Sequence, residues 1–367
     1  MNQKHILVVG GYGKVGGTAA RWLSSEVKQK VVVAGRNLSA AEQMVRESGG
    51  NLQARFLDLH RPEQHNAALQ DVGLVMMCVE QTDLGFVEAC IRNGVHYVDI
   101  TATHNFMQQV ETLNSEAQHA GVNVVLSVGL APGLTNLMAA HALQEFDQVD
   151  RLNLSILLGL GEKHGDMAVD WTVHNLIHPF EEDRQGRTRT IQPFTERHPA
   201  DFAAPYGKRQ AYRFNFADQH VLRRTLQVPD IRTHLCFDSA PLTDLVALLG
   251  GLGVFRLAGQ WKLQGLLRQV FARVHAGTDV FGIAVDAHGT KAGQPFHLQT
   301  SLLGHNEARM TGLMAGWVAR ELMGRAFPAG VHHIEQLFDP SRALHFATQQ
   351  GCQLHVPSGK RHSSPTT

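Results

Sequence analysis

The chain has 367 residues, of which 43% are hydrophobic and 18% charged, and its formal net charge is zero. This length favours two domains, and the composition is that of an ordinary globular protein. A neutral chain argues against nucleic acid or an anionic membrane as partner. No run of 18 apolar residues occurs, and a strand is expected within five residues of the first methionine, so we expect neither a membrane span nor a signal peptide.

The first predicted element is a short apolar strand over residues 6–9, followed at once by a glycine-rich turn and a helix. Gly11, Gly13 and Gly16 have the spacing G-x-G-x-x-G, which allows a tight turn and a close approach of the backbone to a pyrophosphate. Free N–H groups at the start of the helix then hold the phosphates. The sequence therefore predicts a dinucleotide-binding turn made of Gly11, Tyr12, Gly13, Lys14, Val15 and Gly16.

The second predicted strand, residues 31–34, leads into Gly35, Arg36 and Asn37. Arg36 lies 20 residues after Gly16, close to where an NAD enzyme carries an acidic residue for the ribose 2′-hydroxyl. An arginine fits a 2′-phosphate instead. We therefore expect NADP(H), with Arg36 and Asn37 among its contacts. The alternative is an Arg36 that faces solvent, with FAD or no ligand in the turn.

Further strands are predicted at 52–57, 73–79, 96–100 and 122–128, with helices at 39–49, 83–93 and 106–119 between them. This alternation predicts a doubly wound parallel sheet, which binds ligands at the carboxyl ends of its strands. Residues at those ends become cofactor candidates: Asp58, Leu59, Cys78 and Val79. Asp58 is read equally well as a helix N-cap.

The sixth strand leaves through a loop of small residues, 129–136, before the helix predicted at 134–143. We expect Gly129, Ala131 and Pro132 to pass under a nicotinamide ring, although the loop also suits a hinge between domains.

From residue 149 the pattern changes to a strand at 152–158, a helix at 167–177 and short strands at 188–193, 210–216 and 233–237. Segments 281–285 and 295–303 flank His288-Gly289 and predict a long hairpin. The apolar helix predicted at 308–323 has Gly312 and Gly316 on one face. Residues 184–232 hold ten Lys or Arg and four Asp or Glu, so we expect either a solvated basic face or a site for substrate carboxylates.

No metal site is expected. The four cysteines have no metal-ligand spacing, and the 22 histidines are scattered, with His332 and His333 adjacent and therefore diverging on most backbones. Reduced thiols indicate a cytoplasmic protein.

Three segments carry a family resemblance: residues 10–16 with 34–36, residues 86–99, and residues 129–136 with 324–335. On these, the chain resembles the saccharopine dehydrogenase (saccharopine reductase-like) family of NADP-binding oxidoreductases. The resemblance implies a Rossmann domain over 1–131 and 305–350, and an α+β substrate and dimerisation domain over 132–304. It also implies a C-terminal helix that returns to the first domain, a homodimer, and a tail over 351–367.

The leading functional hypothesis is hydride transfer from NADPH to an imine formed from an amine and a carbonyl compound that bears a carboxylate. The expected substrate residues are Asn136, Trp171, Arg213 and Arg224. Candidates for catalysis follow the fifth strand: Asp99, Thr101 and His104. A histidine suits the role of proton donor because it titrates near neutral pH. We favour His104 because it lies on the ligand-binding edge of the sheet; His174 and His178 are alternatives. Two other functions stay open, namely reduction of a C=C or C=O bond, and an NADP(H)-binding sensor without turnover. An apolar pocket of Trp171, Phe180, Phe214 and Leu222 would favour the first of these.

Overall fold

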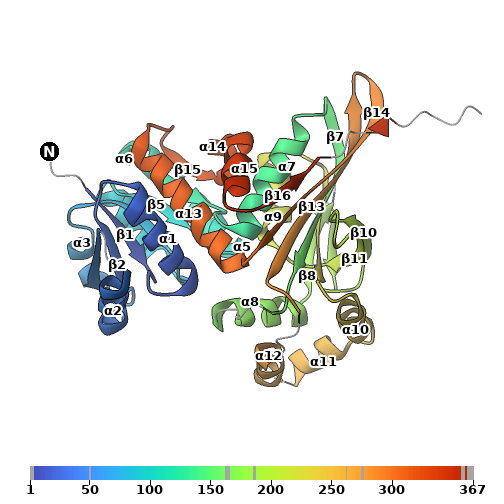
Figure 1. Cartoon of the computed structure of the whole chain (residues 1–367), viewed down its shortest axis with the longest axis horizontal. Helices are drawn as coiled ribbons and strands as arrows, with labels where there is room; N and C mark the ends of the chain where they lie inside the picture. Colours follow the sequence, from blue (N-terminus) through green and yellow to red (C-terminus); the bar gives the residue numbers. More distant parts are fainter. Residues whose placement is uncertain are drawn as a thin grey trace, which may run out of the picture. The chain divides into compact units, whose positions relative to one another are not determined.

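The computed structural model describes residues 4–48, 51–161, 166–184, 187–261, 263–273, 277–356 and 360–361 (Figure 1). The chain divides into two compact units, one of residues 1–134 with 308–338 and one of residues 135–307 with 339–367. This division differs from the expected domain limits at the C-terminal side, because residues 339–350 group with the second unit. Part of the expected tail, residues 357–359 and 362–367, lies outside the described residues.

The first unit is built on a seven-stranded parallel sheet, which confirms the predicted doubly wound fold. Its strands, in spatial order, are β15 (Gly330–His333), β6 (Asn123–Leu126), β5 (His96–Asp99), β4 (Val72–Met77), β1 (His5–Val9), β2 (Val31–Gly35) and β3 (Leu52–Phe56). The central strands are buried on both faces, as their unbroken apolar runs require. Strand β15 is not among the strands predicted from the sequence.

The helices of this unit are α1 (Lys14–Glu26), α2 (Leu38–Ser48), α3 (His65–Ala68), α4 (Gly85–Arg92), α5 (His104–Glu111), α6 (Asn114–Ala120), α13 (Glu307–Gly324) and α14 (Ile334–Leu337). The helix predicted at 106–119 is divided at Thr112-Leu113 into α5 and α6. Asn37 caps α2, because its Oδ1 accepts a hydrogen bond from Ala40 N at 3.0 Å.

Two glycines let α13 lie directly on α1. A side chain at Gly312 would meet the Val15 carbonyl oxygen at 2.6 Å, and one at Gly316 would meet the Trp22 ring at 2.7 Å. The expected return of a C-terminal helix to the first domain is therefore confirmed.

The second unit contains a mixed eight-stranded sheet. Its main path is β10 (Arg197–Asp201), β11 (Lys208–Arg213), β12 (Asp230–Phe237), β7 (Gln148–Leu158), β13 (Val280–Lys291), β14 (Gln294–His305) and β16 (Gln353–His355), and β17 (Lys360–Arg361) pairs with β14. A separate hairpin joins β8 (Phe180–Arg184) to β9 (Arg187–Ile191). The helices are α7 (Thr135–Leu143), α8 (Asp166–Ile177), α9 (Ala217–Thr225), α10 (Ala240–Gly251), α11 (Val254–Gln260), α12 (Gln264–Arg273) and α15 (Pro340–Gln349).

The β13–β14 hairpin is longer than predicted, and its turn was misplaced. The chain reverses at Ala292 and Gly293, whose φ angles are 51° and 70°, and not at His288-Gly289. Two consecutive left-handed residues suit a tight hairpin turn. In this register His288 is paired with His297, well inside the sheet.

Within the described residues, no single helix is long and apolar enough to cross a membrane. Helices α10 and α11 meet that length and composition only as a pair, across a bend of 60°.

Candidate functional site

The glycine turn after β1 is shaped by close backbone contacts. The Gly13 N–H donates to the Gly10 carbonyl at 2.9 Å, and a side chain at Gly16 would lie 2.5 Å from that same oxygen. Gly16 is therefore required for α1 to start directly behind the turn. Gly13, at the N-cap of α1, carries no side chain, and Gly13 and Lys14 are exposed. The first N–H groups of the helix are thus available to an anion.

Tyr12, Arg36 and Asn37 meet beside this turn, at the carboxyl end of β2. The Asn37 N–H donates to the Tyr12 hydroxyl at 3.3 Å, and a side chain at Gly35 would meet the Tyr12 ring at 2.6 Å. The ring therefore lies on Gly35, and Arg36 next to it is exposed. This places an exposed guanidinium where the chain leaves β2, next to the glycine turn.

The candidates on β3 and β4 lie at the same edge. Val79 packs on the turn, since a side chain at Gly10 would meet its Cγ1 at 2.6 Å. Burial, with Asp99 nearby, raises the pKa of the Cys78 thiol well above its ordinary range, so it stays protonated. Asp58 accepts from His60 N at 3.2 Å and lies 3.4 Å from Arg61 Nε, but it is not a helix N-cap, because the next helix, Pro62–Gln64, has Arg61 at that position. The half-buried Leu59 offers its carbonyl to His65 Nε2 at 3.0 Å.

Asp99, at the end of β5, is 1% exposed, and its carboxylate is held by neighbouring groups. The Tyr97 hydroxyl donates to Oδ2 at 2.8 Å, Gln81 Nε2 donates to it at 3.4 Å, and Thr101 N donates to Oδ1 at 2.8 Å. Burial raises the pKa of Asp99 to about 6, although the Thr101 and Tyr97 hydrogen bonds oppose this. Both carboxylate oxygens of Asp99 are therefore engaged by neighbouring groups.

Thr101 is also buried, whereas His104, the first residue of α5, is half-buried. The sequence reading did not find Gln81 or Tyr97. Gln81 follows β4 as Thr101 follows β5, so the rule that selected Thr101 would have selected it too.

The loop after β6 contacts α13. The Leu130 N–H donates to Thr311 Oγ1 at 3.2 Å, and a side chain at Gly129 would meet Thr311 Cγ2 at 3.1 Å. Ala131 is half-buried and Pro132 is buried. A helix from the far end of the chain thus positions the loop predicted to meet the nicotinamide, and nothing in the loop itself indicated Thr311.

A buried chain of hydrogen bonds joins Ser127 to His333 Nδ1 at 2.7 Å, and His333 Nε2 to Glu111 Oε1 at 3.1 Å. The order serine, histidine, carboxylate is that of a hydrolase triad. Ser127, however, has no exposed surface, so no substrate reaches it. The chain ties β6, β15 and α5 together.

The expected substrate residues of the second unit have separate surroundings. Arg213 is fully buried, and its Nη2 lies 2.8 Å from Glu182 Oε1 and 3.1 Å from Gln219 Oε1. Its predicted contact with a substrate carboxylate is wrong for this structure, because a buried ion pair already uses the guanidinium. Arg224 is exposed and donates to the His220 carbonyl of its own helix at 3.1 Å.

Asn136 is fully buried on α7, and Trp171 packs on Phe214 and Phe216 with ring centroids 5.9 and 5.3 Å apart. Phe180, Phe214 and Leu222, the other residues of the suggested apolar pocket, are buried. The rings of His174 and His178 stack at 4.2 Å on exposed positions of α8 and its end.

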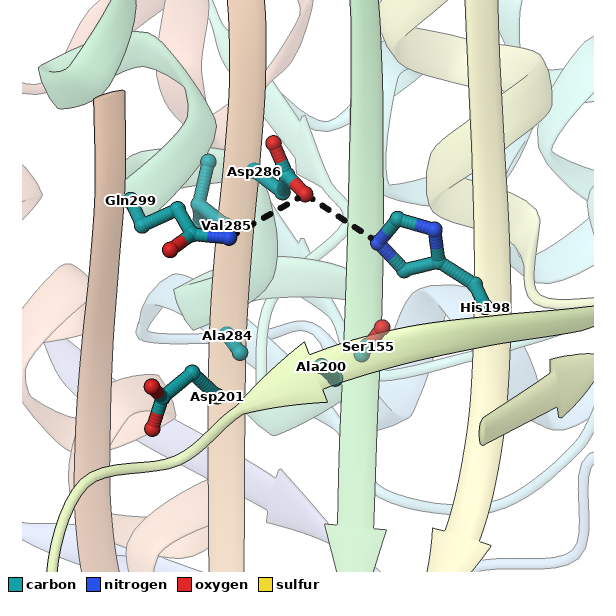
Figure 2. Close-up of a pocket in the computed structure, with 8 residues that line it drawn as sticks. All are labelled: Ser155, His198, Ala200, Asp201, Ala284, Val285, Asp286 and Gln299. Atoms are coloured by element: carbon teal, nitrogen blue, oxygen red, sulfur yellow. Dashed lines mark hydrogen bonds and ion pairs between the residues drawn. The ribbon is translucent and has the colours of Figure 1, made fainter. Parts of the chain in front are cut away.

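A further cluster lies on the second sheet. Figure 2 shows Asp286 between His198, on β10, and Gln299, on β14. Asp286 Oδ1 is 2.8 Å from His297 Nε2 and 2.9 Å from His288 Nε2. Burial alone would raise the pKa of Asp286, but the polar contacts with His198 and His297 outweigh it and lower that pKa to about 2. Asp286 is therefore a carboxylate.

Comparisons with known proteins agree with this geometry. Residues 6–125 match the family model of the saccharopine dehydrogenase NADP binding domain. The chain is 24% identical over 161 residues to a carboxyaminopropylagmatine dehydrogenase from Synechocystis sp., a match that covers 41% of this chain and 40% of that relative. The solved structure of apo saccharopine dehydrogenase (L-Glu forming) from Saccharomyces cerevisiae is similar with a TM-score of 0.71 at 15% identity, over 97% of this chain and 100% of that chain.

The match spans less than half of the Synechocystis relative, so that protein's activity is not transferred by it. The glycine turn and the sheet edge around it fall within the matched domain, whose cofactor is NADP. Residues 6–125 match a saccharopine dehydrogenase NADP-binding domain, and the chain as a whole has a fold similar to that of saccharopine dehydrogenase.

Proposed function

We propose that the protein is an NADP(H)-dependent oxidoreductase that reduces the C–N double bond of an imine formed from an amine or amino acid and a carbonyl compound. One observation carries the proposal, namely the glycine turn with the exposed Arg36 beside it, inside an NADP-binding domain of the saccharopine dehydrogenase kind. The relatives support the substrate class by their names, one a saccharopine dehydrogenase and the other a carboxyaminopropylagmatine dehydrogenase.

The turn residues 11–16 would hold the pyrophosphate through backbone N–H groups, and Arg36 would hold the 2′-phosphate beside Tyr12 and Asn37. Bound NADPH supplies the hydride. The remaining contacts that we assign to the cofactor are Asp58, Leu59, Cys78, Val79, Gly129, Ala131 and Pro132. Cys78, with its thiol protonated and buried, would contribute backbone groups.

The protein has to manage one proton during imine formation and reduction. We propose His104 for this role, because it is half-buried at the start of α5, directly after the carboxyl end of β5. Asp99 would act as a positioning residue, since Tyr97, Gln81 and Thr101 fix its carboxylate. Thr101 would hold that loop in place. For the substrate we keep Trp171 and the exposed Arg224, but not Asn136, which has no exposed surface.

The decisive screen follows NADPH oxidation with 2-oxo acids and aldehydes, each with and without amino acids. Turnover that needs both a carbonyl compound and an amine supports the proposal. Turnover with an enone or a ketone alone identifies a C=C or C=O reductase and ends the imine proposal. Binding of NADPH without any turnover identifies a sensor.

We also propose a cytoplasmic homodimer. All four cysteines are free and buried, which suits a reducing compartment. Large apolar side chains are exposed on α10 and at the end of α11, among them Leu252 at 67% and Trp261 at 70%, and a second copy would cover such a surface. Sedimentation of the wild type and of Leu252→Glu tests this, with a dimer expected for the first and a monomer for the second.

A further inference from the structure

The register of the β13–β14 hairpin brings three metal-ligating side chains together on one face of the second sheet. Asp286 and His288 are two residues apart on β13, so their side chains point to the same face. His297 on β14 is directly opposite His288. The two imidazole rings stack with centroids 4.1 Å apart and an angle of 6° between their planes.

The potential ligand atoms of these residues converge. One oxygen of Asp286, Oδ1, faces the Nε2 atoms of both histidines, at 2.9 Å for His288 and 2.8 Å for His297. The ligand atoms of the three residues all lie within 4.8 Å of one another. The side chains of Asp286 and His297 are 13% and 20% exposed, and that of His288 is 45% exposed. The cluster is therefore held in the sheet on one side and open to solvent on the other.

We propose that Asp286, His288 and His297 bind a divalent transition-metal ion, with Zn²⁺ as the preferred ion. Two imidazole nitrogens and one carboxylate oxygen are a common donor set for zinc, and imidazole also suits the neighbouring first-row metals. Three protein ligands on a partly exposed face leave a coordination position for water or a small ligand.

The required rearrangement is small. Zinc–ligand distances of about 2.0–2.1 Å at tetrahedral angles separate two ligand atoms by about 3.3 Å. The nitrogens are now 2.8 and 2.9 Å from Asp286 Oδ1 and within 4.8 Å of each other. Side-chain movements of about 0.5 Å for the first two distances, and of at most about 1.5 Å between the nitrogens, would therefore admit the ion.

The second oxygen of Asp286 already has partners that would orient it. His198 Nε2 lies 3.3 Å from Oδ2, and Gln299 Nε2 donates to Oδ2 at 3.4 Å. His198 comes from β10, at the opposite edge of the main sheet path, and Figure 2 shows β10 crossing over the strands at this point. Such outer contacts fix ligand orientation in metal sites. The alternative is a purely structural ion-pair cluster with no affinity for metals.

The test is a titration of the chelator-treated full chain with Co²⁺, whose visible absorption reports its coordination, followed by competition with Zn²⁺. We expect one Co²⁺ per chain, displaced by Zn²⁺, and a higher thermal unfolding temperature in the presence of Zn²⁺. His288→Asn and His297→Asn should each weaken metal binding by at least about 100-fold, and His198→Asn by about 10-fold.

The matched control is His305→Asn. His305 sits on the same strand as His297 and pairs with a carboxylate, Asp279, at 2.7 Å, but it is not one of the three converging ligands. This variant should bind Co²⁺ as the wild type does. Thermal unfolding without metal shows whether each variant folds, and His288→Gln or His297→Gln replaces one that does not. Equal Co²⁺ binding by the wild type and the His288 and His297 variants, or no saturable binding at all, would overturn the proposal. NADPH binds in the first unit, so its affinity is measured separately and does not depend on the result of the metal titration.

Discussion

Two aspartates, one in each unit, have their pKa values shifted in opposite directions. Asp99, in the first unit, is held by neutral donors and has its pKa raised to about 6. Asp286, in the second, is surrounded by three histidines, and its pKa is lowered to about 2. Burial acts on both in the same sense, so the neighbours decide the charge. Asp99 can exchange a proton near neutral pH, whereas Asp286 remains an anion that suits a cation.

The largest effect is expected where the second unit buries an ion pair. Arg213→Met should lower the free energy of unfolding by about 3–5 kcal/mol, because Glu182 would be left as a buried charge without its main partner. Urea unfolding measures this. Arg224→Met, at an exposed arginine, should change stability by less than about 0.5 kcal/mol. If Arg213→Met lowered the free energy of unfolding as little as Arg224→Met does, the buried ion pair would contribute little to stability.

Asp99 should give the first unit a distinctive pH dependence. Its pKa rises from the ordinary 3.8 to about 6 on folding, so the folded state holds the proton more tightly. The stability that Asp99 contributes is therefore full below pH 3.8 and is lost as pH rises through 6. Each pKa unit corresponds to about 1.4 kcal/mol, so the free energy of unfolding should fall by about 3 kcal/mol over this pH range.

Urea unfolding of the wild type and Asp99→Asn between acid and neutral pH tests this value. The stability of the wild type relative to the variant should fall as pH rises. A pH-independent difference would mean that Asp99 has an ordinary pKa.

Gly16→Ala should damage cofactor binding and folding together. The added methyl group would lie 2.5 Å from the Gly10 carbonyl oxygen, which the turn cannot move without losing its shape. We expect a loss of about 1–3 kcal/mol in stability and NADPH binding at least about 10-fold weaker. Gly324→Ala is the control in the same unit, since a side chain there meets open space. Thermal unfolding and NADPH fluorescence titration measure the two effects, and an intact Kd in Gly16→Ala would argue against phosphate binding at the turn.

Arg36→Ala should have the smallest effect, confined to cofactor choice. Because Arg36 is exposed, we expect NADPH binding to weaken by about 10-fold and NADH binding to stay unchanged. Fluorescence titrations with both cofactors measure this. Equal affinity of the wild type for NADPH and NADH would contradict the 2′-phosphate role of Arg36.

The difference between the two units also explains how much of the structure could be predicted from the sequence. In the parallel sheet of the first unit, every strand end that follows an apolar run lies at one edge, so alternation alone placed Gly11, Arg36, Val79 and Thr101 together. The missed strand β15 is four residues long and pairs with β6, more than 200 residues earlier in the chain. No local pattern reports such a pairing.

The second unit depends on contacts between strands, which spacing does not reveal. The hairpin turn was placed at His288-Gly289, which hid the pairing of His288 with His297; the strands in fact continue to Ala292-Gly293. Likewise Arg213 was predicted to bind a substrate carboxylate, because nothing local reveals its partner Glu182, which lies 31 residues away on another strand. Asp-x-His on one strand was a visible signal for the cluster, but His297 and His198 require the tertiary structure.

The most direct test of the central claim uses NADPH carrying deuterium at C4 in place of the transferred hydride. The protein is incubated with this cofactor, a 2-oxo acid and an amino acid, and the product is analysed by mass spectrometry. We predict a secondary amine with deuterium on the carbon bonded to nitrogen, formed when both substrates are present. A deuterated hydroxy acid, formed equally well without the amino acid, would contradict imine reduction.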